Sequence, residues 1–235
     1  MNPNNKTSRV LGIAFLLQFI TSISSGLFIR PLWLVPGNIS QTMLKIADNP
    51  WPIMANILTD MLTALGVIFL GAILFISLRK QNEKIALVAL GFYILEAGLL
   101  ATSRIATFSL LHISQEYVIA GQPDYLPILG NLAFESMDFV GDTLHALAFC
   151  LGGILFYYLL YKSSLIPRIL SLWGLITILP VLIGTLTAIF NYDLPFVLFI
   201  PYVPFEFVVG VWILIKGIPE IRGQLAQTGA ALSTN

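Results

Sequence analysis

Long uncharged apolar stretches dominate the chain, and short polar segments separate them. A stretch of about twenty apolar residues is long enough to cross the hydrocarbon core of a bilayer as a helix. The pattern predicts an all-α protein, a polytopic membrane helix bundle with six transmembrane helices. The predicted spans cover about residues 10–29, 52–78, 85–111, 139–161, 169–190 and 194–215. They form a single transmembrane domain over residues 1–222, and a disordered cytoplasmic tail is expected at residues 223–235.

The beginning of the chain has some features of a secretory signal peptide. Lys6 and Arg9 precede the first apolar stretch, and small residues follow it. The stretch from Val10 to Ile29 is nevertheless long enough to span a membrane. We therefore expect an uncleaved first transmembrane helix.

Lysine and arginine are distributed unevenly between the two sets of connecting segments. One set holds only Arg30 and Lys45. The other set holds Lys6, Arg9, Arg79, Lys80, Lys84, Lys162, Arg168, Lys216 and Arg222. Because cytoplasmic loops are enriched in lysine and arginine, both termini are expected in the cytoplasm.

Two outer loops are expected from polar and turn-forming residues. In residues 30–51, Ser40 can cap a short helix with one apolar side, and an irregular loop is the alternative. Trp33 and Trp51 stand at the two ends of this loop, as aromatic anchors do at a membrane interface. We expect this short helix to lie on the outer membrane surface. A second polar loop is expected at residues 114–127.

Three segments of the chain resemble a known family. They are LFIRPLWLVPGNISQTMLKIADNPWPIMANILTDMLTALGVIFLGAILFISLRK, GGILFYYLLYKSSLIPRILSLWGLITILPVLIG and FEFVVGVWILIKG. The family is the bacterial membrane family called domain of unknown function 4386. The resemblance covers nearly the whole chain and implies a multi-pass protein of the bacterial cytoplasmic (inner) membrane. It implies no activity.

Several ionisable side chains fall inside or at the edge of the predicted spans. They are Asp60, Glu96, Arg104, Asp138, Asp142, His145 and Glu206. An ionised group at the centre of a bilayer costs at least ~2.5–3.5 kcal/mol on insertion scales. These side chains should therefore be paired, neutralised, or directed toward water or protein.

A polar stripe leads into the fourth span. Glu135, Asp138, Asp142 and His145 follow one another at intervals of three or four residues, which places them on one face of a helix. If one helix runs from 127 to 161, it is about 52 Å long, and its polar beginning extends beyond the hydrocarbon core.

Helical rise predicts a layer of charge near the outer boundary of the membrane. At about 1.5 Å per residue, Asp60, Arg104, Asp142 and His145 come to similar heights on three helices. We expect Asp142 and His145 to point into the bundle, and Asp138 to adjoin this pocket. The alternative is purely structural, in which Asp60 and Asp142 only neutralise Arg104 and hold three helices together.

A second layer is expected near the midplane, where Glu96 and Glu206 come to similar heights. Pro201 and Pro204 should break the helix just before Glu206 and free backbone carbonyls. The two carboxyls could meet across the bundle and share a proton, as proton or cation partners. The alternative is a protonated Glu206 that is hydrogen-bonded to a freed carbonyl.

The chemistry-bearing motifs narrow the function only partly. No metal is predicted, because the chain has one cysteine and two histidines; Asp138, Asp142 and His145 are weak candidate ligands. No cofactor motif is present, and a net charge of zero gives no footprint for nucleic acid. The expected partners are the lipid bilayer and a small-molecule or ion ligand, bound or transported through the outer pocket. An intramembrane enzyme acting on a lipid-type substrate, or a structural or regulatory subunit, are the alternatives, and the oligomeric state stays open.

Overall fold

The computed structural model describes residues 3–192 and 194–217, which form helices, turns and loops without a β-strand. Five segments are long and apolar enough to cross a membrane: Arg9–Trp33, Trp51–Leu78, Glu83–Ile119, Leu126–Ser163 and Arg168–Ile189. The predicted disordered tail at residues 223–235 lies outside the described residues.

The first helix is longer than the apolar pattern predicts. Helix α1 (Pro3–Ile23) continues through a π-helical segment, η1 (Ser24–Ile29), into the short helix α2 (Arg30–Trp33). Arg30 was expected in a loop and is instead part of this helical run. Trp33, expected as an interfacial anchor, is fully buried, whereas Trp51 is 74% exposed.

The predicted short helix in the first outer loop is present as α3 (Ile39–Asp48). Its cap is Asn38 rather than Ser40, because the Asn38 side chain accepts a hydrogen bond from the Gln41 backbone N–H at 3.0 Å.

The two longest helical runs are much longer than the hydrocarbon core of a bilayer is thick. Helix α4 (Trp51–Leu78) is followed by α5 (Glu83–Ile119), whose 37 residues are about 56 Å long. The loop predicted at 114–127 is shorter, because Ser114 and Tyr117 are buried and keep α5 helical to Ile119. Helix α6 (Leu126–Asp138), the π-helical segment η2 (Phe139–Leu144) and α7 (His145–Ser163) form one continuous run. The expectation of one long helix that begins near residue 127 agrees with this run.

The C-terminal part contains an interrupted helix where the last span was predicted. Helix α8 (Arg168–Ile189) is followed by a 3-10 turn, η3 (Phe196–Leu198), and by α9 (Val203–Lys216). The predicted break before Glu206 is present: Pro195 and Pro201 precede the regular helix, which begins at Val203, and Pro204 lies in its first turn, where no backbone N–H is needed. With 14 residues, α9 is about 21 Å long and by itself shorter than a hydrocarbon core of about 30 Å.

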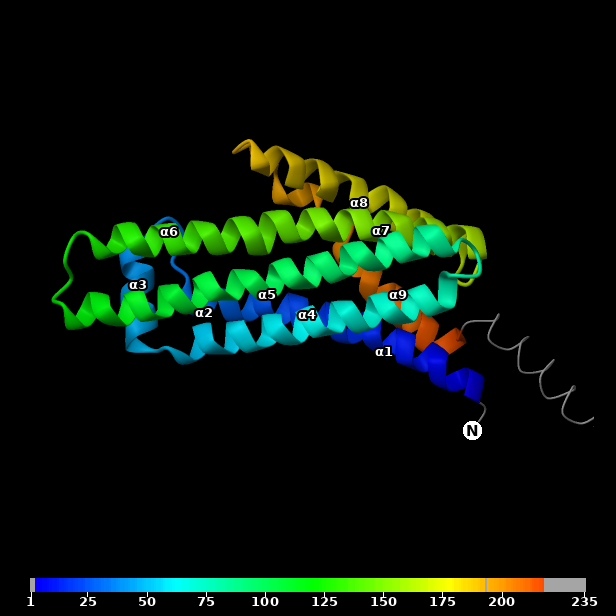
Figure 1. Cartoon of the computed structure of the whole chain (residues 1–235), viewed down its shortest axis with the longest axis horizontal. Helices are drawn as coiled ribbons and strands as arrows, with labels where there is room; N and C mark the ends of the chain where they lie inside the picture. Colours follow the sequence, from blue (N-terminus) through cyan, green and yellow to red (C-terminus); the bar gives the residue numbers. More distant parts are fainter. Residues whose placement is uncertain (1–2, 193, 218–235) are drawn as a thin grey trace, which may run out of the picture.

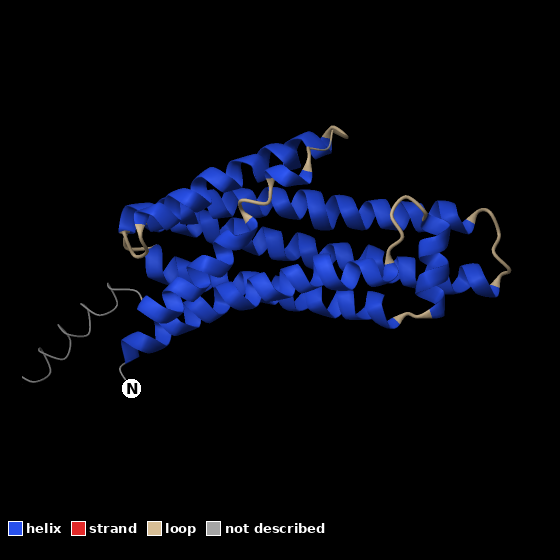
Figure 2. Ribbon diagram, turned by 180° about the vertical axis from the view of Figure 1, so that it is seen from behind, coloured by secondary structure: helices blue, strands red, loops and turns tan. Residues whose placement is uncertain are grey.

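Helix α5 lies in the middle of the bundle and packs against α4, α6 and α7 (Figure 1). Helix α1 packs against α4 and α9, and α8 packs on α7 while its far end leans away from the bundle (Figure 1). Both ends of the drawn helical chain lie at the end of the bundle that carries the α4–α5 and α7–α8 turns. The short helix α3 and the α5–α6 loop lie at the opposite end, as the reverse view also shows (Figure 2).

Two separate hydrophobic cores stabilise the bundle. The larger core joins α1, α4, α5, α7 and α9 and includes Phe15, Leu74, Tyr93 and Phe156. The smaller core lies around α3 and the adjoining ends of α5 and α6, and it includes Trp33. On α4 and α5 a band of buried polar residues lies between the two cores, and this band positions the candidate site.

Candidate functional site

The polar band contains short groups of buried polar residues at helical spacing. Helix α4 contributes Asn56, Asp60 and Thr63, and α5 contributes Ser103, Arg104 and Thr107. The intervals of three and four residues place each group on one face of its helix. The two faces meet between the cores, where a lone charge would be costly.

Asp60 and Arg104 form a buried ion pair across these two helices. Arg104 Nη1 donates to Asp60 Oδ2 at 2.5 Å, and the residues are only 7% and 8% exposed. The Ser25 hydroxyl donates to Asp60 Oδ1, and the Asn56 amide donates to Oδ2 at 3.1 Å. The carboxylate therefore receives hydrogen bonds from three helical segments, which compensates for the loss of water.

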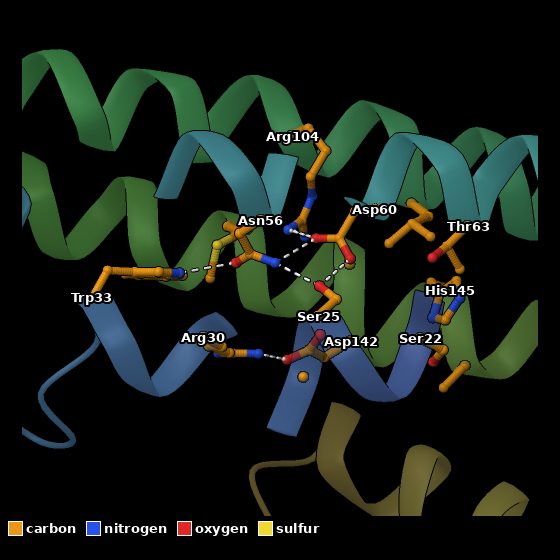
Figure 3. A pocket seen from close by; sticks show the side chains of 15 residues that line it. Ser22, Ser25, Arg30, Trp33, Asn56, Asp60, Thr63, Arg104, Asp142 and His145 are labelled. Carbon is orange, nitrogen blue, oxygen red and sulfur yellow. Dashed lines mark hydrogen bonds and ion pairs between the residues drawn. The ribbon is translucent and has the colours of Figure 1, made fainter. Parts of the chain in front are cut away.

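Asn56 connects this pair to the smaller hydrophobic core, which includes Trp33. Its Nδ2 also contacts the Ser25 oxygen at 2.5 Å, and its Oδ1 accepts a hydrogen bond from Trp33 Nε1 at 3.0 Å. One amide therefore links α2, η1 and the Asp60 carboxylate (Figure 3). Such a satisfied network holds the buried polar groups in one arrangement.

Arg30 forms the second charge cluster. It binds Asp142 through Nη1 at 2.5 Å and binds Asp138 through Nη2. Asp142 was predicted to face the Asp60–Arg104 pair, and its bonded partner is Arg30 instead. The reason is that the first helix continues past residue 29 and carries Arg30 to the level of η2.

Both π-helical segments border the site. Ser25 and Gly26 belong to η1, and Gly141 and Asp142 belong to η2. A π-helical turn adds one residue to the α-helical repeat, and such turns are frequent at functional sites. At Gly141 the backbone lies so close to α5 that an added Cβ would be 2.6 Å from both Arg104 Nη2 and Ser103 Oγ.

These side chains line a cavity of about 250 Å³ that is partly open to the outside. Its charged lining consists of Arg30, Arg104, Asp60 and Asp142, with His145 as a titratable neighbour. Ser22, Ser25, Asn56 and Thr63 supply further polar atoms, and Figure 3 shows most of these groups pointing toward a common space. The fixed charges are balanced, two arginines against two aspartates.

His145 lines the cavity and also lies near the buried carboxyl of Glu96, which is not part of the cavity lining. Its Nε2 is 3.6 Å from Glu96 Oε1. Glu96 is 2% exposed, and its Oε2 has no hydrogen-bond partner among the described residues. The prediction that His145 points toward Asp60 and Arg104 is therefore met only in that all three line one cavity.

Glu206 is not directly hydrogen-bonded to Glu96 in the part of the chain described. Its Oε1 accepts a hydrogen bond from the Tyr202 hydroxyl at 2.9 Å. The Tyr202 and Tyr157 hydroxyls are 2.6 Å apart and share a hydrogen bond. Tyrosines thus lie where the sequence predicted a direct meeting of two carboxyls.

The structure also adds residues that the sequence analysis did not place in the site. Arg30 had been counted as a loop charge, Trp33 as a surface anchor, and the tyrosines had been given no role. No group of three histidine, cysteine or acidic side chains within the described ranges is arranged to hold a metal ion. Asp138 and Asp142 bind Arg30, while His145 faces Glu96.

The fold and the buried charges define a multi-helix protein of membrane type with a polar pocket between its helices. The chain belongs to the family described as domain of unknown function 4386, whose sequence profile matches residues 10–217. This match agrees with the resemblance seen in the sequence. No curated protein and no solved structure matches the chain.

Proposed function

We propose that this protein binds a small polar molecule, neutral or zwitterionic, in the cavity between the Asp60–Arg104 pair and the Arg30–Asp142 pair. The supporting observation is the charge balance of the lining. A ligand with net charge would leave an uncompensated charge beside the buried Asp60–Arg104 pair, which is costly. A zwitterion or a neutral polar molecule can exchange hydrogen bonds with the lining and keep the balance.

The proposed setting is a bacterial inner membrane crossed six times, with both termini in the cytoplasm. In this topology, the sixth crossing runs from about 194 to 216 and contains the proline-rich break before α9. Irregular backbone is tolerated at membrane depth where protein buries it or where it lines a cavity. The uneven distribution of lysine and arginine supports the orientation.

Cysteine labelling tests this topology. The native Cys150 is buried, so added cysteines can be compared without background. A membrane-impermeant maleimide should label Asp124→Cys in spheroplasts and should label Gln81→Cys only after permeabilisation. The opposite pattern, or equal labelling of both, would contradict the orientation.

The proposed route to the site passes Arg30. Besides the central cavity, Arg30 lines an outer vestibule of about 680 Å³ beneath the α2–α3 loop. Its partners Asp138 and Asp142 line a lateral groove of about 250 Å³ against α8. The arginine and its two aspartates therefore lie at the junction of three spaces, and in this proposal an incoming molecule displaces or exchanges one of these ion pairs.

We further propose that the bound molecule is transported across the membrane. The break before α9 favours transport, because carriers place interrupted helices at their binding sites, and so do the carboxyls of the buried Glu96 and the partly buried Glu206. In this proposal, the outer cavity is the loading site, and the larger core below it closes the cytoplasmic side.

The decisive experiment is ligand-dependent thermal stabilisation of the purified full-length protein in lipid nanodiscs. The probes are the standard amino acids, glycine betaine, choline and small sugars. At least one zwitterion or neutral probe should stabilise the wild type, and Asp142→Asn should abolish that shift. Asp124→Asn, an exposed loop carboxylate, is the matched control. A panel without any shift, or shifts retained in Asp142→Asn, would favour a structural or regulatory role.

A further inference from the structure

Glu96 is a buried carboxyl without a direct hydrogen bond in the part of the chain described. The 3.6 Å separation from His145 exceeds hydrogen-bonding distance, and Oε2 is unpartnered. An ionised carboxylate in such surroundings would lack both water and hydrogen-bond donors. The geometry therefore favours the protonated form of this side chain.

A line of tyrosine hydroxyls extends from the neighbourhood of Glu96 to Glu206. Tyr93 lies one helical turn before Glu96 on α5 and interacts with the Tyr157 hydroxyl. Tyr157 in turn shares a hydrogen bond of 2.6 Å with Tyr202, which donates to Glu206 at 2.9 Å. Tyr93 and Tyr157 are 2% and 0% exposed, so this part of the line is shielded, whereas Tyr202 and Glu206 are only partly buried.

The charged and titratable groups around Glu96 supply little compensation for a negative charge. Its own helix contributes Tyr93 and Arg104, and Arg104 is bound to Asp60, the one ionisable side chain of α4. Helix α7 contributes His145, Cys150 and Tyr157, and the C-terminal segment contributes Tyr202 and Glu206. No lysine or arginine of the described residues forms an ion pair with either glutamate.

We propose that Glu96 and Glu206 form a proton-binding site that holds one exchangeable proton, and that the tyrosine hydroxyls connect the two carboxyls once the Glu96 side chain turns to form a hydrogen bond with the line, which it does not form in this structure. Each hydroxyl accepts a proton on one side while it releases its own on the other, so a proton moves without a net change in any tyrosine. Glu96 becomes ionised when Glu206 becomes protonated, and the reverse. This proposal does not require a ligand in the outer cavity.

His145 gives the proton site a connection to that cavity. It lines the cavity and also faces Glu96. If the proposed ligand binding is correct, a ligand that contacts His145 changes the surroundings of Glu96. The proton affinity of Glu96 then changes as well. The site would then couple proton binding to ligand binding through one imidazole.

Infrared spectroscopy of the full-length protein in lipid nanodiscs tests the proton site without any ligand. At neutral pH we expect a carbonyl stretch of a protonated carboxylic acid, which disappears as the pH is raised. The double variant Glu96→Gln with Glu206→Gln should remove this band, whereas either single variant should shift it, because the proton then resides on the remaining carboxyl. Tyr202→Phe should shift its frequency, because the substitution interrupts the hydrogen-bonded line and keeps the ring. Glu135→Gln, at an exposed carboxyl bonded to Asn131, should leave the band unchanged.

Two outcomes would overturn the proposal. One is a wild-type spectrum without a protonated carboxylic acid at neutral pH, and this result does not depend on any variant folding. The other is an unchanged band in the double variant Glu96→Gln with Glu206→Gln. Neither outcome depends on the ligand screen, so failure of the proton site and failure of the ligand site remain distinguishable.

Discussion

The guanidinium of Arg104 on α5 meets the carboxylate of Asp60 on α4 at 2.5 Å, in a layer that separates two hydrophobic cores. Both residues are more than nine-tenths buried. The pair replaces water with protein hydrogen bonds from Ser25 and Asn56. Because each partner compensates the charge of the other, their separate and joint removal should have different consequences.

Removing one partner of this pair should destabilise the protein strongly. Asp60→Ala leaves Arg104 as a buried unpaired cation, and we expect a loss of about 3–5 kcal/mol in the free energy of unfolding. The double variant Asp60→Asn with Arg104→Met should lose less than Asp60→Ala alone, since no lone charge remains. Thermal or denaturant unfolding in detergent measures both. Equal losses in the single and double variants would show that the pair does not act as a unit.

The sequence contained enough information to place this pair but not its surroundings. Helical rise and the cost of burying charge put Asp60 and Arg104 at the same height, and the structure joins them. The same reasoning misassigned Arg30, because the end of an apolar run does not reveal that the helix continues through a π-helical segment. The tyrosine line was missed because tyrosine is common in apolar helices, and only tertiary packing brings three hydroxyls from separate segments together.

For the fold, too, some features could be predicted from the sequence and others could not. Apolar length predicted the positions of the long helices to within a few residues at most ends, because the hydrocarbon core sets that length. The prediction from apolar length failed at Ser114–Ile119. There the packing of Tyr117 in the smaller core keeps the chain helical although the local composition is polar. Between α8 and α9 the predicted proline break is present, and only the end of the apolar stretch, α9, is a regular helix.

Gly141 should tolerate no side chain. In Gly141→Ala the added Cβ would lie 2.6 Å from Arg104 Nη2 and Ser103 Oγ, so Arg104 or the η2 backbone has to move. We expect a loss of about 1–3 kcal/mol, as for overpacked cores. Gly98→Ala is the matched control, because nothing lies within 4 Å of its added Cβ. It should be neutral or stabilising by up to about 1 kcal/mol. The midpoints of thermal unfolding of the two variants provide the comparison, and similar midpoints would contradict the close approach.

The indole N–H of Trp33 should contribute to stability separately from its ring. Trp33→Phe keeps an aromatic side chain in the smaller core but leaves Asn56 Oδ1 without the hydrogen bond that the indole N–H donates. A buried unsatisfied acceptor costs about 1–3 kcal/mol, with a further cost for the smaller ring. Trp51→Phe, at a position that is 74% exposed, should change the free energy of unfolding little. If Asn56→Ala in the Trp33→Phe background costs as much as in the wild type, the two side chains are not coupled.

Arg30 should control access to the central cavity, because it binds Asp138 and Asp142 at the junction of three spaces. Thr63→Cys places a thiol in the cavity lining at a position that is 3% exposed in the native protein. In Arg30→Gln, which cannot bind both aspartates, a small polar maleimide should label this thiol faster than in the protein that retains Arg30.

The buried native Cys150 should remain unlabelled in both proteins and reports on intact folding. Arg30→Lys should be intermediate, since one ammonium replaces a fork that reaches two carboxylates. Identical labelling rates in all three backgrounds would mean that the ion pairs do not separate the cavity from the outside.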